Sequence, residues 1–215
     1  MMEWVWNDSE RANAFILARA GYDVWMGNNR GSKFSQGHMS LSTKDKAYWD
    51  FYQEDMGTKD VPTFIDFILD KTGHETLSYV GHSDGTTQMF LAASLNPDYF
   101  ADRINVFVAL APCSIQAGIS DVMIEAAKSI KLIEWLVVDQ LGFYNWFPPL
   151  PLADGAIDIV CDLVPDACKY VIEHVHNRDG VDNAERFDIL MSTEPSGQSY
   201  RTFVWQAQMA AKGKN

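Results

Sequence analysis

The 215-residue sequence lacks both a long hydrophobic segment and a cluster of basic residues. No apolar run approaches the roughly 18 residues of a membrane-spanning helix, so we expect no transmembrane segment. Acidic residues outnumber basic ones by 29 to 17, which gives a net charge of −12. Because phosphate backbones are bound by clustered lysine and arginine, we expect no nucleic-acid partner. The N-terminus has no basic segment followed by an apolar one, so no signal peptide is visible.

Cysteine is scarce, with three residues, of which at least one must be unpaired. Cys161 and Cys168 would lie about 10 Å apart along a continuous helix, too far for a disulfide. Pro165 between them can break that helix, so a Cys161–Cys168 bridge stays open as an alternative. Cys113 follows an apolar segment and is predicted to be a small buried side chain. One glycosylation sequon begins at Asn7.

The most informative segment is residues 76–95, where an apolar β-type run and a helical pattern flank the pentapeptide Gly81-His82-Ser83-Asp84-Gly85. The pattern G-x-S-x-G between strand and helix is typical of a nucleophile elbow, a sharp turn that exposes a serine hydroxyl. We expect a strained backbone at Ser83 and a helix N-terminus that favours developing negative charge. Side chains replacing Gly81 or Gly85 are expected to collide with the strand and helix. His82 is expected to be structural.

Short apolar segments alternate with helical patterns in the first 113 residues. We expect strands at 22–26, 77–80 and 104–110, and helices at 8–20, at 48–71 with an interruption near 57–62, and after the elbow to residue 95. Such alternation indicates a parallel sheet flanked by helices, an α/β fold. The near-continuous apolar character of 104–110 predicts a strand buried on both faces.

After residue 113 the alternation ends, and aromatic-rich helical segments follow. We interpret residues 114–200 as an inserted helical cap over the sheet edge where α/β active sites open, and 201–215 as the start of a return to the core. Acidic residues repeat every four positions at Asp154, Asp158, Asp162 and Asp166. This repeat is interpreted as a solvated helix face.

The chain resembles the acid lipase family of the α/β-hydrolase fold, which includes gastric lipase, lysosomal acid lipase and the sterol-ester lipases. The resemblance runs in one register through residues 14–31, 60–73, 79–87, 109–112 and 195–213. It implies an α/β-hydrolase fragment with few parallel strands: a partial core at 1–113, a cap or lid at 114–200, and a truncated return at 201–215.

The resemblance also implies an activity, the hydrolysis of triacylglycerols or cholesteryl esters through an acyl-enzyme on Ser83. The backbone N–H of Asp84 would be one oxyanion donor, and a histidine oriented by an acid would be the base. No metal or organic cofactor is implied. The implied partner is a neutral lipid ester at a droplet or a lipid–water interface. Relatives are often lysosomal or secreted, whereas the sequence itself does not fix a compartment.

Family members carry the triad acid and histidine beyond the cap, and a second oxyanion donor in a His-Gly-apolar loop before the first matching block. Neither part is present in this sequence. We therefore expect a fragment of a protein about twice as long, inactive by itself. The remaining histidines, His38, His74, His174 and His176, are expected to supply neither a triad base nor a metal site.

One position departs from the family, since most relatives carry glutamine where this chain has Asp84. A carboxylate there opposes an oxyanion unless it points away or is protonated, so we expect Asp84→Gln to keep or raise activity. Two alternatives stay open. One is a non-catalytic lipid-binding or regulatory remnant, and the other is a different hydrolase of this fold, such as a peptidase or thioesterase.

Overall fold

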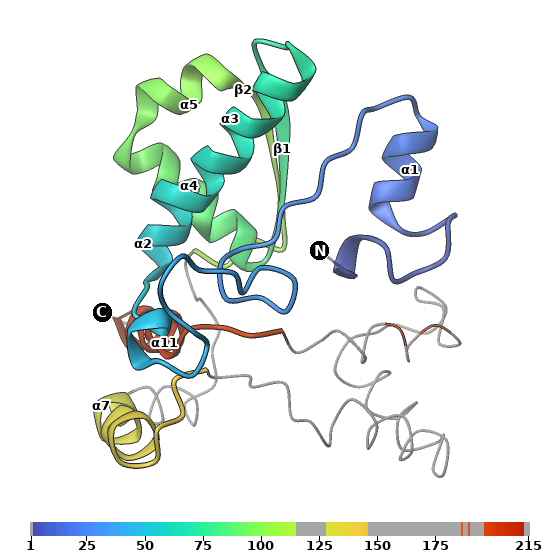
Figure 1. Ribbon diagram of the computed structural model, residues 1–215. Helices are drawn as coiled ribbons and strands as arrows, with labels where there is room; N and C mark the ends of the chain where they lie inside the picture. Colours follow the sequence, from blue (N-terminus) through green and yellow to red (C-terminus); the bar gives the residue numbers. More distant parts are fainter. Residues whose placement is uncertain (1, 115–127, 146–185, 187–188, 190–195, 213–215) are drawn as a thin grey trace. The chain divides into compact units, whose positions relative to one another are not determined.

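The computed structural model describes residues 2–114, 128–145, 186, 189 and 196–212 (Figure 1). The chain divides into two compact units, Met1–Asn28 with Phe147–Gly197, and Asn29–Trp146 with Gln198–Asn215. The second unit contains the predicted elbow. Among the described residues, no helix combines the length and apolar character needed to cross a membrane.

The first unit contains the short 3₁₀ helix η1 (Met2–Trp4) and the helix α1 (Asn13–Arg19). The predicted helix from residue 8 starts later than expected. The carbonyl of Asp8 accepts hydrogen bonds from the N–H groups of Arg11 and Ala12, at 3.1 and 2.9 Å, and so forms a turn before α1. The predicted end is confirmed, because Gly21 follows with a φ of 92°.

The strand predicted at residues 22–26 is not formed. Among the described residues none forms a sheet with this segment, and its exposed side chains include Tyr22 at 64% and Trp25 at 42%. A strand is stabilised by its neighbours rather than by its own propensity, so an apolar β-type run without a pairing partner does not become one. The prediction of three strands is therefore wrong for the described residues, which contain two.

The second unit is built on two parallel strands, β1 (Leu77–His82) and β2 (Ile104–Leu110). Their register places Tyr79 opposite Phe107 and His82 opposite Leu110. The helices α4 (Asp84–Leu95) and α5 (Pro97–Arg103) connect them, and Pro97 begins α5 where the sequence predicts a stop after α4. This strand–helix–strand connection confirms the predicted parallel α/β arrangement (Figure 1).

One face of the sheet packs against helices. The buried core on this side is formed by Val61, Ile65, Met89, Ala92 and Phe100. Phe107 contacts Tyr79 and Phe90 edge to face, with ring centroids 5.7 and 5.1 Å apart. On the other face, Val106 and Val108 are 51% and 40% exposed. The prediction that β2 is buried on both faces is therefore wrong for the described structure.

A helical segment precedes β1, with a non-helical break at residues 50–52 inside the range predicted from residue 48. It consists of η2 (Lys46–Trp49), α2 (Gln53–Asp55), the π-helix η3 (Met56–Asp60) and α3 (Val61–Thr72). The interruption predicted near 57–62 is the π-helix rather than a break. At Gly57 an added Cβ would lie 2.8 Å from the carbonyl oxygen of Gln88, so glycine lets α4 approach. Gly73, with a φ of 70°, ends α3 as predicted.

An ion pair fixes the turn at residues 29–31 to the start of α3. The guanidinium of Arg30 donates to Oδ1 of Asp60 from Nε at 2.8 Å and from Nη2 at 2.6 Å, and the Arg30 backbone N–H donates to Oδ2 at 3.1 Å. The Asp60 side chain is only 10% exposed. The turn and α3 both belong to blocks that carry the family resemblance, and this contact joins them.

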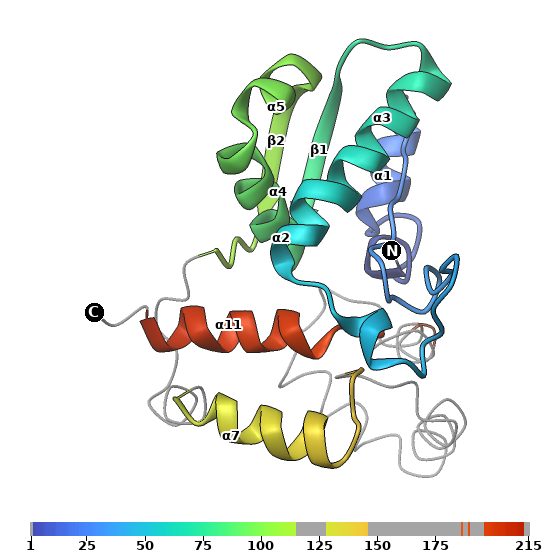
Figure 2. The same cartoon turned by 60° about the vertical axis from the view of Figure 1, so that its left-hand side comes forward.

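A second buried cluster lies beside the sheet's helices and includes Tyr48, Trp49, Phe51, Met56, Val138 and Tyr200. Its members come from η2, residue 51, η3, the π-helix η4 (Trp135–Gln140) and α11 (Tyr200–Lys212). The helix α7 (Ile130–Glu134) directly precedes η4. Figure 2 shows α11 and α7 running side by side. Much of 114–200 lies outside the described residues, so the predicted cap and its boundaries stay predictions.

Candidate active site

Ser83 lies in the turn between β1 and α4, as the strand–turn–helix pattern predicts. Its side chain is exposed, and its backbone has φ 48° and ψ −114°. The Ser83 N–H donates to the carbonyl of Leu110 at 3.0 Å, which ties the turn to the end of β2. The Ser83 carbonyl accepts from the N–H and Oγ1 of Thr86, at 3.0 and 2.6 Å. These bonds hold the turn on both sides while the hydroxyl faces outward.

Backbone strain is concentrated at this edge of the sheet. Among the described residues, Ser83 and Ala111 are the two non-glycine residues with positive φ, at 48° and 46°. They follow the carboxyl ends of the adjacent strands β1 and β2. Positive φ is costly for residues with a Cβ, and such strain gathers at functional sites in many proteins. The strained positions therefore mark the edge at which ligands bind in open parallel sheets.

The two glycines of the pentapeptide have different roles. A Cβ added at Gly81 would lie 2.9 Å from the carbonyl carbon and oxygen of Gly85 and 3.0 Å from the nitrogen of Thr86. The collision expected at Gly81 is therefore present. At Gly85 an added Cβ would meet only Oη of Tyr79, at 3.9 Å, which is an ordinary contact. The collision expected at Gly85 is absent, because this position faces the tyrosine rather than the strand backbone.

Cys113 lies next to the serine. Its Sγ is 3.9 Å from Oγ of Ser83 and 3.3 Å from Oγ1 of Thr87, and its N–H donates to Oγ1 of Thr86 at 3.4 Å. The cysteine is partly exposed, so the prediction of a buried small side chain is wrong. The backbone turns at Ala111 and brings the thiol to the rim of the elbow. Cys161 and Cys168 lie outside the described residues, and their disulfide stays a prediction.

The carboxylate of Asp84 is surrounded by glutamine amides. Oδ1 accepts from Nε2 of Gln53 at 2.7 Å and from Nε2 of Gln206 at 3.0 Å, and Oδ2 accepts from Nε2 of Gln88 at 2.8 Å. These donors belong to α2, α11 and α4. Asp84 is also the first residue of α4, where a negative charge is favoured and the backbone N–H has no intrahelical acceptor. Negative charge is thus held by neutral donors beside the serine.

Tyr79 lies beside the turn, and burial is the main influence on the pKa of its phenol. Burial, with a further contribution from the negative charge of Asp84, raises the pKa of Tyr79 to about 12. Its phenol donates to the carbonyl of Gly85 at 3.2 Å. The neutral phenol therefore stabilises the turn through this hydrogen bond. Its ionisation would place a phenolate near the carboxylate of Asp84.

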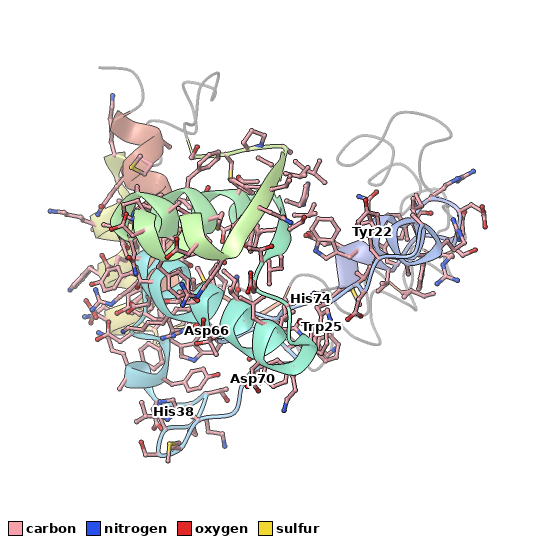
Figure 3. The ribbon with its side chains drawn as sticks, turned by 90° about the horizontal axis from the view of Figure 1, so that it is seen from above. Tyr22, Trp25, His38, Asp66, Asp70 and His74 are labelled. Carbon is pink, nitrogen blue, oxygen red and sulfur yellow. The ribbon has the colours of Figure 1, made fainter. Side chains whose placement is uncertain are left out.

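The structure describes His38, His74 and His82, and the expectation that none of them is the base for the serine stays a prediction. Nδ1 of His38 accepts from the N–H groups of Ser40 and Leu41, at 3.1 and 2.9 Å, so it stabilises its own loop. Figure 3 shows His38 before η2 and His74 beyond the end of α3, far from each other. His82 ends β1, directly next to the serine. His174 and His176, like the acidic repeat at 154–166, lie outside the described residues.

Two further predicted features concern ligands and modification. No group of three or more histidine, cysteine or acidic side chains suited to a metal ion is found among the residues that the structure describes. Asn7 is 7% exposed, and its Oδ1 accepts from the N–H of Asp8 at 2.9 Å. Glycosylation of Asn7 stays a prediction, and it would require this side chain to become accessible.

The glutamine partners of Asp84 are absent from the sequence-based expectations. The contact with Gln88 could be predicted from the sequence, since Gln88 lies four residues after Asp84 on the same helix. Gln53 and Gln206 are 31 and 122 positions away, and no local pattern places them at the elbow. These donors bear on the expectation for Asp84→Gln, because a glutamine side chain at this position would have to fit among them.

Comparison with known proteins agrees with this geometry. Residues 10–157 match the alpha/beta hydrolase fold family. The chain is 36% identical to human lipase member K over 98% of its length, 35% identical to mouse gastric triacylglycerol lipase over 98%, and 35% identical to human lysosomal acid lipase/cholesteryl ester hydrolase over 95%. It spans about half the length of these relatives, 53%, 53% and 51% respectively. The chain therefore belongs to the alpha/beta hydrolase fold family and is similar, over nearly all of its residues, to the gastric and lysosomal acid lipases.

Proposed function

We propose that the protein is a carboxylic-ester hydrolase in which Ser83 is the nucleophile. The observation that carries this proposal is the exposed, positive-φ serine between β1 and α4, with Gly81 packed too closely for any other residue. The hydroxyl attacks the ester carbonyl, and the tetrahedral intermediate expels the alcohol to leave an acyl-enzyme on Ser83. Water then hydrolyses this acyl-enzyme and releases the carboxylic acid. The N–H of Asp84, at the first position of α4, stabilises the oxyanion.

The general base and its acid complete this mechanism from outside the described site. Nδ1 of His38 accepts hydrogen bonds from its own loop, and the triad order of the fold puts the acid and then the histidine after the serine. Since the chain spans about half of its relatives, we propose that it is one part of a longer lipase, in which the other part carries both residues and the second oxyanion donor.

The proposed substrates are neutral lipid esters, triacylglycerols or steryl esters, bound at a lipid–water interface. The support is the similarity to relatives that are named triacylglycerol lipase and cholesteryl ester hydrolase. The same relatives support a secreted or lysosomal location as part of the proposal. No metal or organic cofactor takes part in the proposed chemistry, which needs only the serine, its base and the oxyanion donors.

The experiment compares Ser83→Ala with Ser78→Ala in the full-length gene product. Ser78 is exposed on the same strand, where its hydroxyl donates to Oδ1 of Asn105 at 2.8 Å, and it serves as the matched control. Hydrolysis of a long-chain triacylglycerol and a cholesteryl ester is measured beside a peptide and a thioester. We expect turnover of the lipid esters that is lost in Ser83→Ala and kept in Ser78→Ala.

Two other results contradict the proposal. Turnover that survives Ser83→Ala would show that Ser83 is not the nucleophile. Preference for the peptide or the thioester would contradict the lipase assignment. A full-length product that binds lipid without hydrolysing it would support the alternative, a non-catalytic lipid-binding remnant. The 215-residue chain alone is expected to release little product from a chromogenic ester, and a burst that disappears in Ser83→Ala would show that it is self-sufficient.

A further inference from the structure

The Asp84 carboxylate joins three helices at the elbow. Its two oxygens accept from Gln53 on α2, Gln88 on α4 and Gln206 on α11, at 2.7, 2.8 and 3.0 Å. Gln53 is fully buried and Gln88 is 2% exposed, so these two amides have little access to water. Hydrogen bonds to an ionised acceptor are stronger than neutral ones, and buried donors depend on them most.

The amide of Gln53 is oriented toward the carboxylate. The amide turns Nε2 toward Asp84, and its Oε1 is then buried without a hydrogen-bond partner among the described residues. A hydrogen bond from Nε2 to a neutral side chain at position 84 would be weaker, and it would offset less of the cost of the unpaired Oε1 of Gln53. The carboxylate therefore decides the direction of a buried side chain in the second layer around the serine.

Gln206 connects the elbow to the end of the described chain. Its helix α11 is also held by Trp205, whose Nε1 donates to Oε1 of Glu54 at 3.1 Å, and both contacts reach α2 and α4 from 122 or more positions away. Figure 2 shows α11 below α2, on the side away from α3. Asp84 is thus the point at which α11 is attached to the residue next to the nucleophile.

We propose that Asp84 is a positioning residue, whose carboxylate, held by Gln53, Gln88 and Gln206, fixes the first turn of α4 and docks α11 against it. The consequence for catalysis rests on the proposed role of Ser83, because the N–H of Asp84 is the proposed oxyanion donor. A carboxylate next to an oxyanion is unfavourable by charge alone, and the three donors offset this by spreading its charge and by fixing the donor's direction.

The geometry predicts which substitutions are tolerated. Asparagine keeps one oxygen for Gln53 and Gln206, and its Nδ2 faces Gln88, whose amide can turn over to accept. Leucine has a similar size and leaves all three donors without an acceptor. Glutamine is one carbon longer, and its NH₂ group would add a donor in a space where three glutamine amides already donate. We therefore expect Asp84→Asn to be close to the parent, and Asp84→Gln and Asp84→Leu to be impaired.

The experiment measures hydrogen exchange in the 215-residue chain, on peptides that cover α11 and, as an internal reference, α5. The variants are Asp84→Leu, Asp84→Asn and Gln206→Ala, with Gln208→Ala as the control, because Gln208 is exposed on the same helix. We expect exchange in α11 to rise about tenfold in Asp84→Leu and Gln206→Ala, with α5 unchanged. In Asp84→Asn and Gln208→Ala, the exchange rate of α11 should stay near that of the parent chain.

A second readout separates positioning from stability. In the full-length protein, Asp84→Leu should lower kcat about tenfold or more with KM little changed, and Asp84→Asn should restore it. Exchange in α11 that is equal in Gln206→Ala and Gln208→Ala overturns the inference, even if Asp84→Leu fails to fold. If the parent itself never reacts at Ser83, the proposed function fails, while the exchange data still decide whether the carboxylate docks α11.

Discussion

Replacing the two glycines of the elbow by alanine should have opposite effects. At Gly81 the new methyl group would lie 2.9 Å from the carbonyl carbon and oxygen of Gly85 and 3.0 Å from the nitrogen of Thr86. All three are backbone atoms, so no side chain can move aside. The end of β1 and the start of α4 must separate instead, and overpacking of this kind costs about 1 to 3 kcal/mol.

Gly85 is the matched control within the same pentapeptide. An alanine methyl there meets only Oη of Tyr79, at 3.9 Å, and the position lies in the first turn of α4. Alanine is favoured over glycine in helices by up to about 1 kcal/mol, so Gly85→Ala should be neutral or slightly stabilising. The two variants should therefore differ by roughly 1 to 4 kcal/mol.

The assay is urea denaturation of the 215-residue chain with thermal unfolding as a second measure. For a chain of this size each kcal/mol corresponds to about 2 to 4 °C in Tm, so Gly81→Ala should lower Tm by roughly 2 to 12 °C. An unchanged slope with denaturant shows that the difference lies in stability. Equal stability of the two variants would refute the assignment of Gly81 as the point of closest approach.

Three further predictions use other parts of the second unit. Asp60→Ala leaves Arg30 without its partner and should lower the free energy of unfolding by about 2 to 4 kcal/mol; a loss under about 0.5 kcal/mol would contradict this. The pKa of Tyr79 is raised to about 12 in the folded protein and is about 10 when unfolded. Its contribution to the free energy of unfolding is therefore fully present below pH 10 and is lost as pH rises toward 12. Tyr79→Phe should flatten the fall in stability across that window, and an identical slope would contradict the shift. Alkylation of Cys113 with N-ethylmaleimide should slow labelling of Ser83 by a fluorophosphonate in the full-length protein, whereas Cys113→Ser should label normally and ignore the reagent; equal slowing in both would exclude Cys113 as the cause.

The elbow was predictable because its determinants are local. A short apolar strand, a glycine that permits close approach, a serine and a helical pattern lie within twenty consecutive residues, and the backbone follows from them. The end of α3 at Gly73 was predictable for the same reason, since a residue with φ 70° after a helix favours glycine. These features also carry the family resemblance.

Other features depend on partners that a single segment does not encode. The run at 22–26 has strand composition but no pairing partner among the described residues, and Val106 and Val108 are exposed although their strand is apolar throughout. The carboxylate at Asp84 was interpreted without its three donors because two of them are distant in sequence. Burial on the second face of a sheet and amides that converge on one side chain are products of tertiary structure.

The most direct test of the central claim is to locate the covalent adduct that a fluorophosphonate forms with the full-length protein, by mass spectrometry of its peptides. We predict one adduct, on Ser83, formed in step with the loss of lipid-ester hydrolysis and absent from Ser83→Ala. An adduct on another residue, or inhibition that leaves Ser83 unmodified, would contradict the account.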